Sequence, residues 1–237
     1  MSQLNIVVLT YNNLHHTKKC LDHLYKYTKN FNLIVIDNNS TAATTIYLNE
    51  LEKKHNNIVV EFNIENVGII KGRNQGYTIS RMKYPDAKSV CFLDNDQFVL
   101  SGWQDSYFDF FEKGYEVVGK EAWRLREKDF YPYQKINSSK ESFNYVGCGC
   151  MMIREPIFEE LGGFDEIFSP AYFEDPDFCF KAYQKKYKIG WNYNPIVHHQ
   201  KHDLALRGNR RKYFMNSWQK FQEKWKNYNI PVFCMDN

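Results

Sequence analysis

The sequence has almost no net charge, no long apolar run and no cysteine pair with the spacing of a zinc or redox site. Lys and Arg total 31 against 28 Asp and Glu, which gives no global electrostatic case for a nucleic-acid partner. No stretch approaches the roughly 18 to 20 apolar residues that a membrane-spanning helix needs. The six cysteines lack C-x-x-C pairs, so we expect free thiols in a reducing compartment.

The start of the chain carries no charged segment ahead of its first apolar stretch, and that stretch is too short for a signal peptide. We therefore expect a cytoplasmic protein. Many tyrosines and tryptophans leave peripheral contact with the inner face of a membrane open, and anionic lipid is one candidate partner for a local basic stretch. That stretch contains Lys201, Arg207, Arg210, Arg211 and Lys212.

The first hundred residues alternate between strand and helix patterns. Strands are predicted over 4–10, 31–36, 58–62 and 89–94, and helices over 14–27, 44–54 and 72–82. Such alternation is typical of parallel βαβ units with right-handed crossovers. The sequence therefore predicts an α/β fold with one core, in which ligands bind beyond the carboxyl ends of the strands.

Each of these strands ends in polar residues, which begin at Thr10, Asp37, Asn63 and Asp94. In a parallel sheet all four ends would line one edge. Strand ends also need turn-forming residues, so any single one has a purely structural explanation. Four polar ends at one edge favour a binding site.

The last of these ends holds two carboxylates two residues apart, Asp94 and Asp96, directly after an apolar strand. Hard oxygen ligands in this position suit Mg²⁺ or Mn²⁺, ions that usually accompany substrate phosphates. The alternative is a polar turn that closes a buried strand.

Glycines and cations mark a further segment, where Gly68, Gly72 and Gly76 accompany Lys71 and Arg73. Their spacing misses the G-x-G-x-x-G dinucleotide pattern. A loop that enters a helix offers N–H groups and positive charge to anions, so we expect the two cations near a phosphate-bearing ligand. Otherwise they are solvated helix charges.

The second half has shorter strands and more aromatic residues, with a hairpin expected around 128–133 and a closing helix over 209–225. Small residues alternate over 147–150, which suggests a strand that another group approaches closely. The Cys-x-Cys within it lacks the partner spacing of a metal site. Most aromatic residues nearby are expected in the core, and one or two could stack on a sugar ring.

Taken in order, these motifs resemble the family 2 glycosyltransferases, and especially their rhamnosyltransferase-like branch, over roughly residues 4 to 200. The matching segments are VLTYN (8–12), VIDNNS (35–40), ENVG (65–68), NQG (74–76), FLDND (92–96), GGFDE (162–166), FEDPDFC (173–179) and PIVHH (195–199). The sequence departs from the family at Ile69 and Ile70, where small residues are usual.

The resemblance implies the nucleotide-diphospho-sugar transferase (GT-A) fold, a mostly parallel sheet flanked by helices with a smaller acceptor-side sheet. It implies a single domain over 1–237, with a nucleotide-binding half (1–100), an acceptor-binding and catalytic half (101–200) and a C-terminal loop and helix (201–237). The activity implied is metal-dependent, inverting transfer of a hexosyl or deoxyhexosyl group. The sugar would pass from a nucleoside diphosphate to a hydroxyl of a glycan, lipid-linked or protein acceptor, with no nucleic-acid partner.

The resemblance also assigns residues to the donor. The nucleotide-sugar-binding residues would be Thr10, Tyr11, Asn12, Asp37, Asn39, Asn66, Gly68, Lys71, Arg73, Asn74, Asp94 and Asn95. In related folds a segment after the late histidine closes over the diphosphate, which would be the task of Lys201 and the arginines that follow it.

The metal ligands implied are Asp96, the carboxylate usually nearest the ion, and a late histidine. His199 is favoured over His198 because it has the family's spacing and successive strand residues point to opposite faces. An imidazole beside carboxylates favours Mn²⁺ over Mg²⁺. The alternative for the histidine pair is a solvated strand end.

The general base implied is Asp175, which would take the proton of the acceptor hydroxyl, with Glu174 or Asp177 as substitutes. The competing interpretation is that Asp175 caps a helix whose first residue is Pro176. Two other functions share the nucleotide pocket: a nucleotidyltransferase or sugar-nucleotide hydrolase, and a nucleotide-sugar or glycan-binding module without turnover. Neither needs a residue that activates a hydroxyl.

Overall fold

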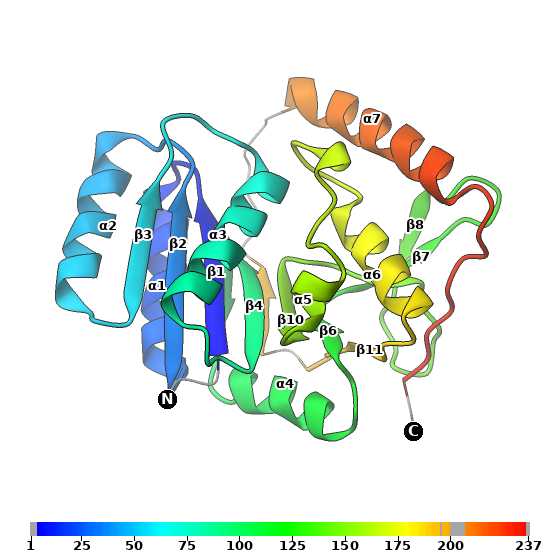
Figure 1. Cartoon of the computed structure of the whole chain (residues 1–237), viewed down its shortest axis with the longest axis horizontal. Coiled ribbons are helices and arrows are strands. Elements are labelled where there is room, and N and C mark those ends of the chain that lie inside the picture. The colour runs from blue at the N-terminus through cyan, green and yellow to red at the C-terminus, as the bar shows by residue number, and fades with distance from the viewer. Residues whose placement is uncertain (1–3, 195, 200–206, 236–237) are drawn as a thin grey trace.

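The computed structural model describes residues 4–194, 196–199 and 207–235. Its centre is a seven-stranded sheet with the order β11-β6-β10-β4-β1-β2-β3 (Figure 1). The strands are β1 (Leu4–Thr10), β2 (Phe31–Asp37), β3 (Ile58–Phe62), β4 (Ser89–Asp94), β6 (Val117–Gly119), β10 (Cys150–Arg154) and β11 (Ile189–Trp191). The sheet takes strands from both predicted halves of the chain.

The first half folds as the periodicity predicts. Strands β3, β2, β1 and β4 are parallel neighbours, and each connection between them runs through a helix. These helices are α1 (Leu14–Tyr27), α2 (Ala42–Lys54) and α3 (Ile69–Lys83). Both faces of the sheet are covered, because Ile6 and Val8 pack in one hydrophobic cluster and Val7 in the other. The predicted α/β fold is confirmed.

The register brings the polar strand ends to one edge, as expected. Thr10 at the end of β1 pairs with Asp37 at the end of β2, and Leu9 pairs with Asp94 on the other side. Asp37 pairs in turn with Phe62, after which Asn63 follows. The carboxyl edge of the sheet is therefore polar along four adjacent strands.

Helix α3 corrects the expectation of a glycine-rich anion loop. It begins at Ile69, so Lys71 and Arg73 lie inside the helix. A Cβ added at Gly72 would lie 2.7 Å from Cδ2 of Leu9, and one at Gly76 would lie 2.4 Å from Cγ1 of Val7. These two glycines let α3 approach β1 closely, which places the side chain of Arg73 under the carboxyl edge.

The second half adds small sheets to the main one. Strands β5 (Gln97–Val99) and β12 (Val197–His199) form an antiparallel pair. A three-stranded sheet has the order β8-β7-β9, with β7 (Ala122–Leu125), β8 (Pro132–Lys135) and β9 (Tyr145–Val146). The predicted hairpin is the β7/β8 pair, and the smaller sheet matches the predicted architecture.

The remaining helices are α4 (Trp103–Glu112), α5 (Ile157–Glu160), the 3₁₀ turn η1 (Glu166–Phe168), α6 (Glu174–Gln184) and α7 (Arg207–Trp225). Figure 1 shows α7 lying beside α6 and the β7/β8 hairpin. All six cysteines are free, as expected. Within the described ranges, no helix is both long and apolar enough to cross a bilayer. The cytoplasmic location and the single-domain organisation stay predictions.

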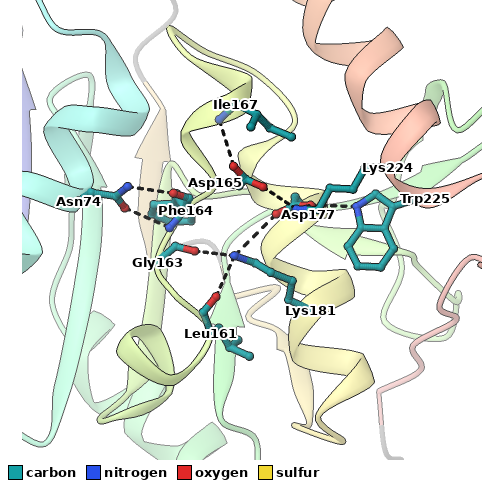
Figure 2. A network of polar contacts seen from close by, with 10 residues as sticks. All are labelled: Asn74, Leu161, Gly163, Phe164, Asp165, Ile167, Asp177, Lys181, Lys224 and Trp225. Atoms are coloured by element: carbon teal, nitrogen blue, oxygen red, sulfur yellow. Dashed lines mark hydrogen bonds and ion pairs between the residues drawn. The ribbon is translucent and has the colours of Figure 1, made fainter.

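A partly buried ion network joins α7 to α6 (Figure 2). Nζ of Lys224 lies 2.7 Å from Asp165 and 2.6 Å from Asp177, whose carboxylate also accepts a hydrogen bond from the Trp225 indole at 2.9 Å. Lys181 reaches the backbone carbonyls of Leu161 and Gly163 on the same side. Asp177 therefore faces the C-terminal helix, and its proposed role as a substitute base is not supported.

Substituting Lys224→Met is expected to lower the free energy of unfolding by about 1 to 3 kcal/mol, because it leaves the fully buried Asp177 carboxylate with fewer charged partners. Chemical denaturation measures the change. Lys226→Met is the control, since Lys226 forms an exposed ion pair with Glu223 and its loss should change stability little. Equal midpoints for the two variants would contradict a stabilising role for the network.

Candidate active site

A buried arginine joins the two acidic motifs. Nη2 of Arg73 lies 2.7 Å from Oδ1 of Asp94, and Nη1 lies 2.8 Å from Oε1 of Glu174. Only 4% of Arg73 is exposed, so the alternative of a solvated helix charge is wrong for this residue. Although burial lowers the pKa of a guanidinium, the negative groups around Arg73 raise its pKa overall and keep it charged. Arg73 thus holds the end of β4 against the start of α6.

Asp96 lies apart from this bridge and faces a histidine. Nε2 of His199 is 3.1 Å from Oδ2 of Asp96, and this hydrogen bond raises the pKa of the imidazole. His198, on the opposite side of the strand, stacks on Phe98 with ring centroids 5.4 Å apart. The structure brings Asp96 together with His199 and turns His198 away, in the geometry that the alternation of a strand requires.

These two side chains set what the site could offer a metal ion. Among the residues that the structure describes, no group of three or more His, Cys, Asp and Glu side chains is arranged to hold one. Mg²⁺ and similar hard ions are often held by one or two protein ligands plus substrate phosphates. An oxygen and a nitrogen ligand 3.1 Å apart at the carboxyl edge fit that kind of site. The metal role of Asp96 and His199 stays a prediction.

The ends of β1 and β2 form a connected polar layer. The hydroxyl of Thr10 lies 2.7 Å from that of Thr17, to which the amide of Asn95 donates at 2.9 Å. The side chain of Asn12 accepts from the backbone N–H of Thr41 at 2.8 Å. Thr10 and Asn95 therefore belong to a buried network, and Asn12 ties the two strand ends together.

Asp37 has spare hydrogen-bonding capacity in this layer. It is 2% exposed, and its Oδ2 accepts from the backbone N–H of Ser40 at 3.1 Å. Its Oδ1 is buried and has no hydrogen-bond partner among the described residues. A buried acceptor left in this way costs free energy unless a donor arrives from a ligand, such as the N–H of a base or the hydroxyl of a ribose.

Of the other residues predicted to bind the nucleotide sugar, some are exposed and others already form hydrogen bonds within the protein. Tyr11, Asn39 and Lys71 are exposed at or near the same edge. The side chain of Asn66 accepts from the backbone N–H of Gly68 at 2.9 Å, so that N–H is already used.

Asn74 points elsewhere. Its amide exchanges hydrogen bonds with the backbone of Phe164, at 2.9 and 3.0 Å (Figure 2). It also donates to the carboxylate of Glu166 at 3.2 Å, so this side chain holds the loop before η1 and the start of η1 itself.

Asp175 lies in the first turn of α6, directly after the Arg73 bridge. The N-cap of this helix is Phe173, so the interpretation of Asp175 as the cap is wrong. Burial and the neighbouring Glu174 carboxylate raise the pKa of Asp175 well above its usual value. Burial also raises the pKa of Glu174, although the latter is paired with Arg73. Asp175 is thus the less neutralised of the two carboxylates.

The backbone ahead of α6 is strained. Tyr172 and Phe173 both have positive φ, 74° and 69°, a conformation that bulky residues rarely adopt. Each such residue costs on the order of 1 to 3 kcal/mol and persists where the surroundings enforce it. Nothing in the sequence signals this turn, which sets the direction in which Glu174 and Asp175 leave the chain.

Asp175 lies next to the segment that follows strand β9 of the small sheet. Trp123 pairs with Lys135 on β8 and with Tyr145 on β9, so these three side chains share a face. A Cβ at Gly147 would lie 3.8 Å from Oδ2 of Asp175, an ordinary van der Waals contact, so Gly147 lies directly beside the carboxylate. That the small residues over 147–150 leave room for a substrate stays a prediction.

Lys120 and Gln97 are two site residues that the sequence did not reveal. Nζ of Lys120 donates to Oε1 of Gln97 at 3.3 Å, next to Asp96 and His199. A lysine after a three-residue strand and a glutamine after the second carboxylate carry no motif. Of the basic stretch, Lys201 lies outside the described residues, whereas Arg210, Arg211 and Lys212 are exposed on α7.

Comparison with known proteins gives the class. The model of glycosyl transferase family 2 matches residues 5–162. The chain belongs to this family.

A curated relative, the poly(ribitol-phosphate) beta-glucosyltransferase of Bacillus spizizenii, is 29% identical over 103 residues, which are 42% of this chain and 16% of that protein.

Solved structures share the fold. They include S. aureus TarS 1-349 (TM-score 0.61, 19% identity, 84% of this chain and 60% of that one). GalNAc-T7 with UDP, GalNAc and Mn²⁺ has a TM-score of 0.75 and 14% identity, and the match covers 96% of this chain and 48% of that one. The mannosyltransferase PcManGT of Pyrobaculum calidifontis with GDP-Man and Mn²⁺ has a TM-score of 0.69 and 16% identity, and the match covers 97% of this chain and 66% of that one. The fold is the GT-A fold, and the chain spans less than two thirds of each of these proteins.

Proposed function

We propose that this protein is a metal-dependent, inverting glycosyltransferase that moves a hexose or deoxyhexose from a nucleoside diphosphate to a hydroxyl acceptor. Membership of family 2 supports sugar transfer. Glucosyl and mannosyl groups in the names of related proteins support a hexose, and UDP and GDP-Man in the neighbouring structures support a nucleotide donor. The acceptor is a hydroxyl of a glycan, a lipid-linked glycan or a protein.

The observation that carries the proposal is the Arg73 bridge. It joins Asp94 at the end of β4 to Glu174 at the start of α6, at 2.7 and 2.8 Å. The next acidic residue of each motif, Asp96 after Asp94 and Asp175 after Glu174, takes no part in this bridge. A donor lying over the bridge would have its diphosphate near Asp96 and its sugar near Asp175.

The transfer follows from these positions. The bond between the anomeric carbon and the β-phosphate oxygen breaks, and its electron pair stays on that oxygen. The acceptor oxygen forms a new bond to the same carbon from the opposite face, which inverts the configuration. Its proton passes to the carboxylate of Asp175, whose raised pKa makes it a stronger base than an ordinary aspartate. Asp37 accepts a hydrogen bond from the base or the ribose.

A divalent cation, Mn²⁺ or Mg²⁺, would be held by Asp96 and His199 together with the donor phosphates, and would stabilise the negative charge of the leaving diphosphate. Mn²⁺ in two neighbouring structures supports this assignment. Metal ligands must be deprotonated, so the raised pKa of His199 makes binding of the ion weaker at low pH.

Removal of the cation with EDTA is expected to abolish transfer, and Mn²⁺ should restore it. His199→Ala and His198→Ala form a matched pair, because only the first faces Asp96. We expect His199→Ala to need at least roughly tenfold more Mn²⁺ for half-maximal rate and His198→Ala to resemble the wild type. Asp96→Ala should be inactive at any Mn²⁺ concentration. A cation-independent, fully active Asp96→Ala variant would defeat the metal assignment.

The alternatives predict different behaviour at Asp175. A nucleotidyltransferase, a sugar-nucleotide hydrolase or a binding module has no hydroxyl of an acceptor to activate. The position of Gly147 beside Asp175 and the shared face of Trp123, Lys135 and Tyr145 favour an acceptor site next to Asp175. Incubation of the protein with a panel of nucleoside diphosphate sugars, Mn²⁺ and candidate glycan acceptors tests the proposal, with a glycosylated product as the expected result.

A further inference from the structure

Lys120 is a partly buried cation that forms no ion pair with any described residue. It directly follows β6, and its ammonium donates to the neutral amide of Gln97 at 3.3 Å. Gln97 comes next after Asp96 in the chain and pairs with His199 across the β5/β12 sheet. The ammonium therefore lies close enough to both predicted metal ligands for its charge to act on them.

The position of this ammonium is fixed by buried neighbours. Gln97 is 3% exposed, and a Cβ at Gly149 would lie 1.9 Å from its Nε2 atom. Glycine at 149 thus leaves the space that the Gln97 amide occupies. The backbone of Lys120 is held as well, because its N–H donates to Cys150 and its carbonyl accepts from the Trp191 indole at 2.9 Å.

An ammonium in this setting is costly for the free protein. Burial lowers the pKa of Lys120, and the nearby charges of Glu121 and Asp96 offset that only in part. Lys224, which is also partly buried, has two carboxylate partners, Asp165 and Asp177. A cation left without such a partner at the carboxyl edge is suited to a negative charge that arrives with a ligand.

We propose that Lys120 binds the diphosphate of the donor and stabilises it as the leaving group. The inference rests on the proposed function. When the bond to the anomeric carbon breaks, the electron pair stays on the β-phosphate oxygen, and the acceptor proton goes to Asp175. The diphosphate then carries one more negative charge, next to which Lys120 supplies a fixed positive charge and a donor N–H.

The test compares Lys120→Met with Lys113→Met. The first keeps the aliphatic stem and removes the charge, and the second removes an exposed charge at the end of α4. Calorimetric titrations would use UDP, GDP, CDP, ADP and dTDP, each against its monophosphate, in Mn²⁺ and again in EDTA. For the diphosphate that the wild type prefers, we expect Lys120→Met to bind roughly 10- to 100-fold more weakly in both series. Its affinity for the monophosphate should stay within about twofold, and Lys113→Met should match the wild type throughout.

The outcomes separate the two proposals. If the wild type binds none of the five diphosphates in Mn²⁺, the proposed function fails and the role of Lys120 fails with it. If the wild type binds one of them and Lys120→Met binds it equally well, only the role of Lys120 is overturned. An equal loss for diphosphate and monophosphate overturns it too, because the contact would not be with the β-phosphate. A melting temperature at or above that of the wild type shows that the variant folds, since an unpaired charge has been removed.

Discussion

The Asp175→Asn variant is expected to transfer sugar about 10²- to 10⁴-fold more slowly than the wild type while it binds the donor equally well. Asparagine keeps the shape and the hydrogen-bond acceptor but cannot take a proton. Asp105→Asn is the matched control, because Asp105 lies in the first turn of α4 as Asp175 lies in that of α6, and it faces solvent. Both substitutions remove an acidic side chain from the first turn of a helix, so both lose its interaction with the helix dipole. Unchanged transfer by Asp175→Asn would remove the general base from the mechanism.

Two pH dependences follow from the direction of the Asp175 pKa shift. A base works when it is deprotonated, so the acid limb of kcat/KM should lie above the ordinary aspartate pKa of about 3.9. The second dependence concerns stability, because folded Asp175 holds its proton more tightly than it does in the unfolded chain. The protonated Asp175 carboxyl therefore stabilises the fold fully below the unfolded pKa, and this stabilisation is lost as the pH rises through the folded pKa.

Asp175→Asn should consequently melt at a higher temperature than the wild type near neutral pH, with the difference vanishing in acid. Thermal melts across the pH range measure this. A variant that is less stable than the wild type at neutral pH would contradict the raised pKa.

Substituting Arg73→Met is expected to lower the free energy of unfolding by about 3 to 5 kcal/mol and to abolish transfer. The change leaves the buried Glu174 carboxylate, 6% exposed, without its only charged partner among the described ion pairs. Half-exposed Asp94 contributes less, since water replaces the lost partner. Urea denaturation measures the change.

The control for Arg73 is Arg126→Met. Arg126 forms an ion pair with Asp129 at 2.6 Å, but both side chains reach solvent, so the pair should be nearly neutral for stability. Stability of Arg73→Met equal to that of Arg126→Met would show that the bridge does not hold β4 against α6. Glu174→Gln combined with Arg73→Met should recover part of the loss, because the uncompensated charge is removed.

The first half of the fold could be predicted because its signals are local. Strands such as β1 and β4 are continuous apolar runs that end in polar residues, and α1 has one apolar face, so both the type and the bounds of these elements follow from the sequence. Parallel pairing follows from the alternation of strand and helix. The glycine-rich loop predicted before residue 72 is part of helix α3 instead. Gly72 and Gly76 let this helix pack against Leu9 and Val7, and sequence alone does not distinguish glycines needed for packing from glycines needed for ligand binding.

The site was predictable only where a motif marks it. Asp94, Asp96 and Asp175 stand in recognisable segments, and the alternation along a strand indicates which histidine faces Asp96. The partners of these groups come from distant parts of the chain: Arg73 is 101 residues from Glu174, and His199 is 103 from Asp96. Lys120 and the strained turn before α6 have no local pattern at all. Tertiary packing decides such contacts.

The most direct test of the whole account is a crystal of the protein grown with a nucleoside diphosphate and Mn²⁺, in which anomalous scattering locates the ion. The account predicts one manganese bonded to Asp96, His199 and the diphosphate, with the base or ribose next to Asp37 and open space leading to Asp175. A nucleotide bound away from the carboxyl edge of the sheet, or a manganese without Asp96 among its ligands, would contradict it.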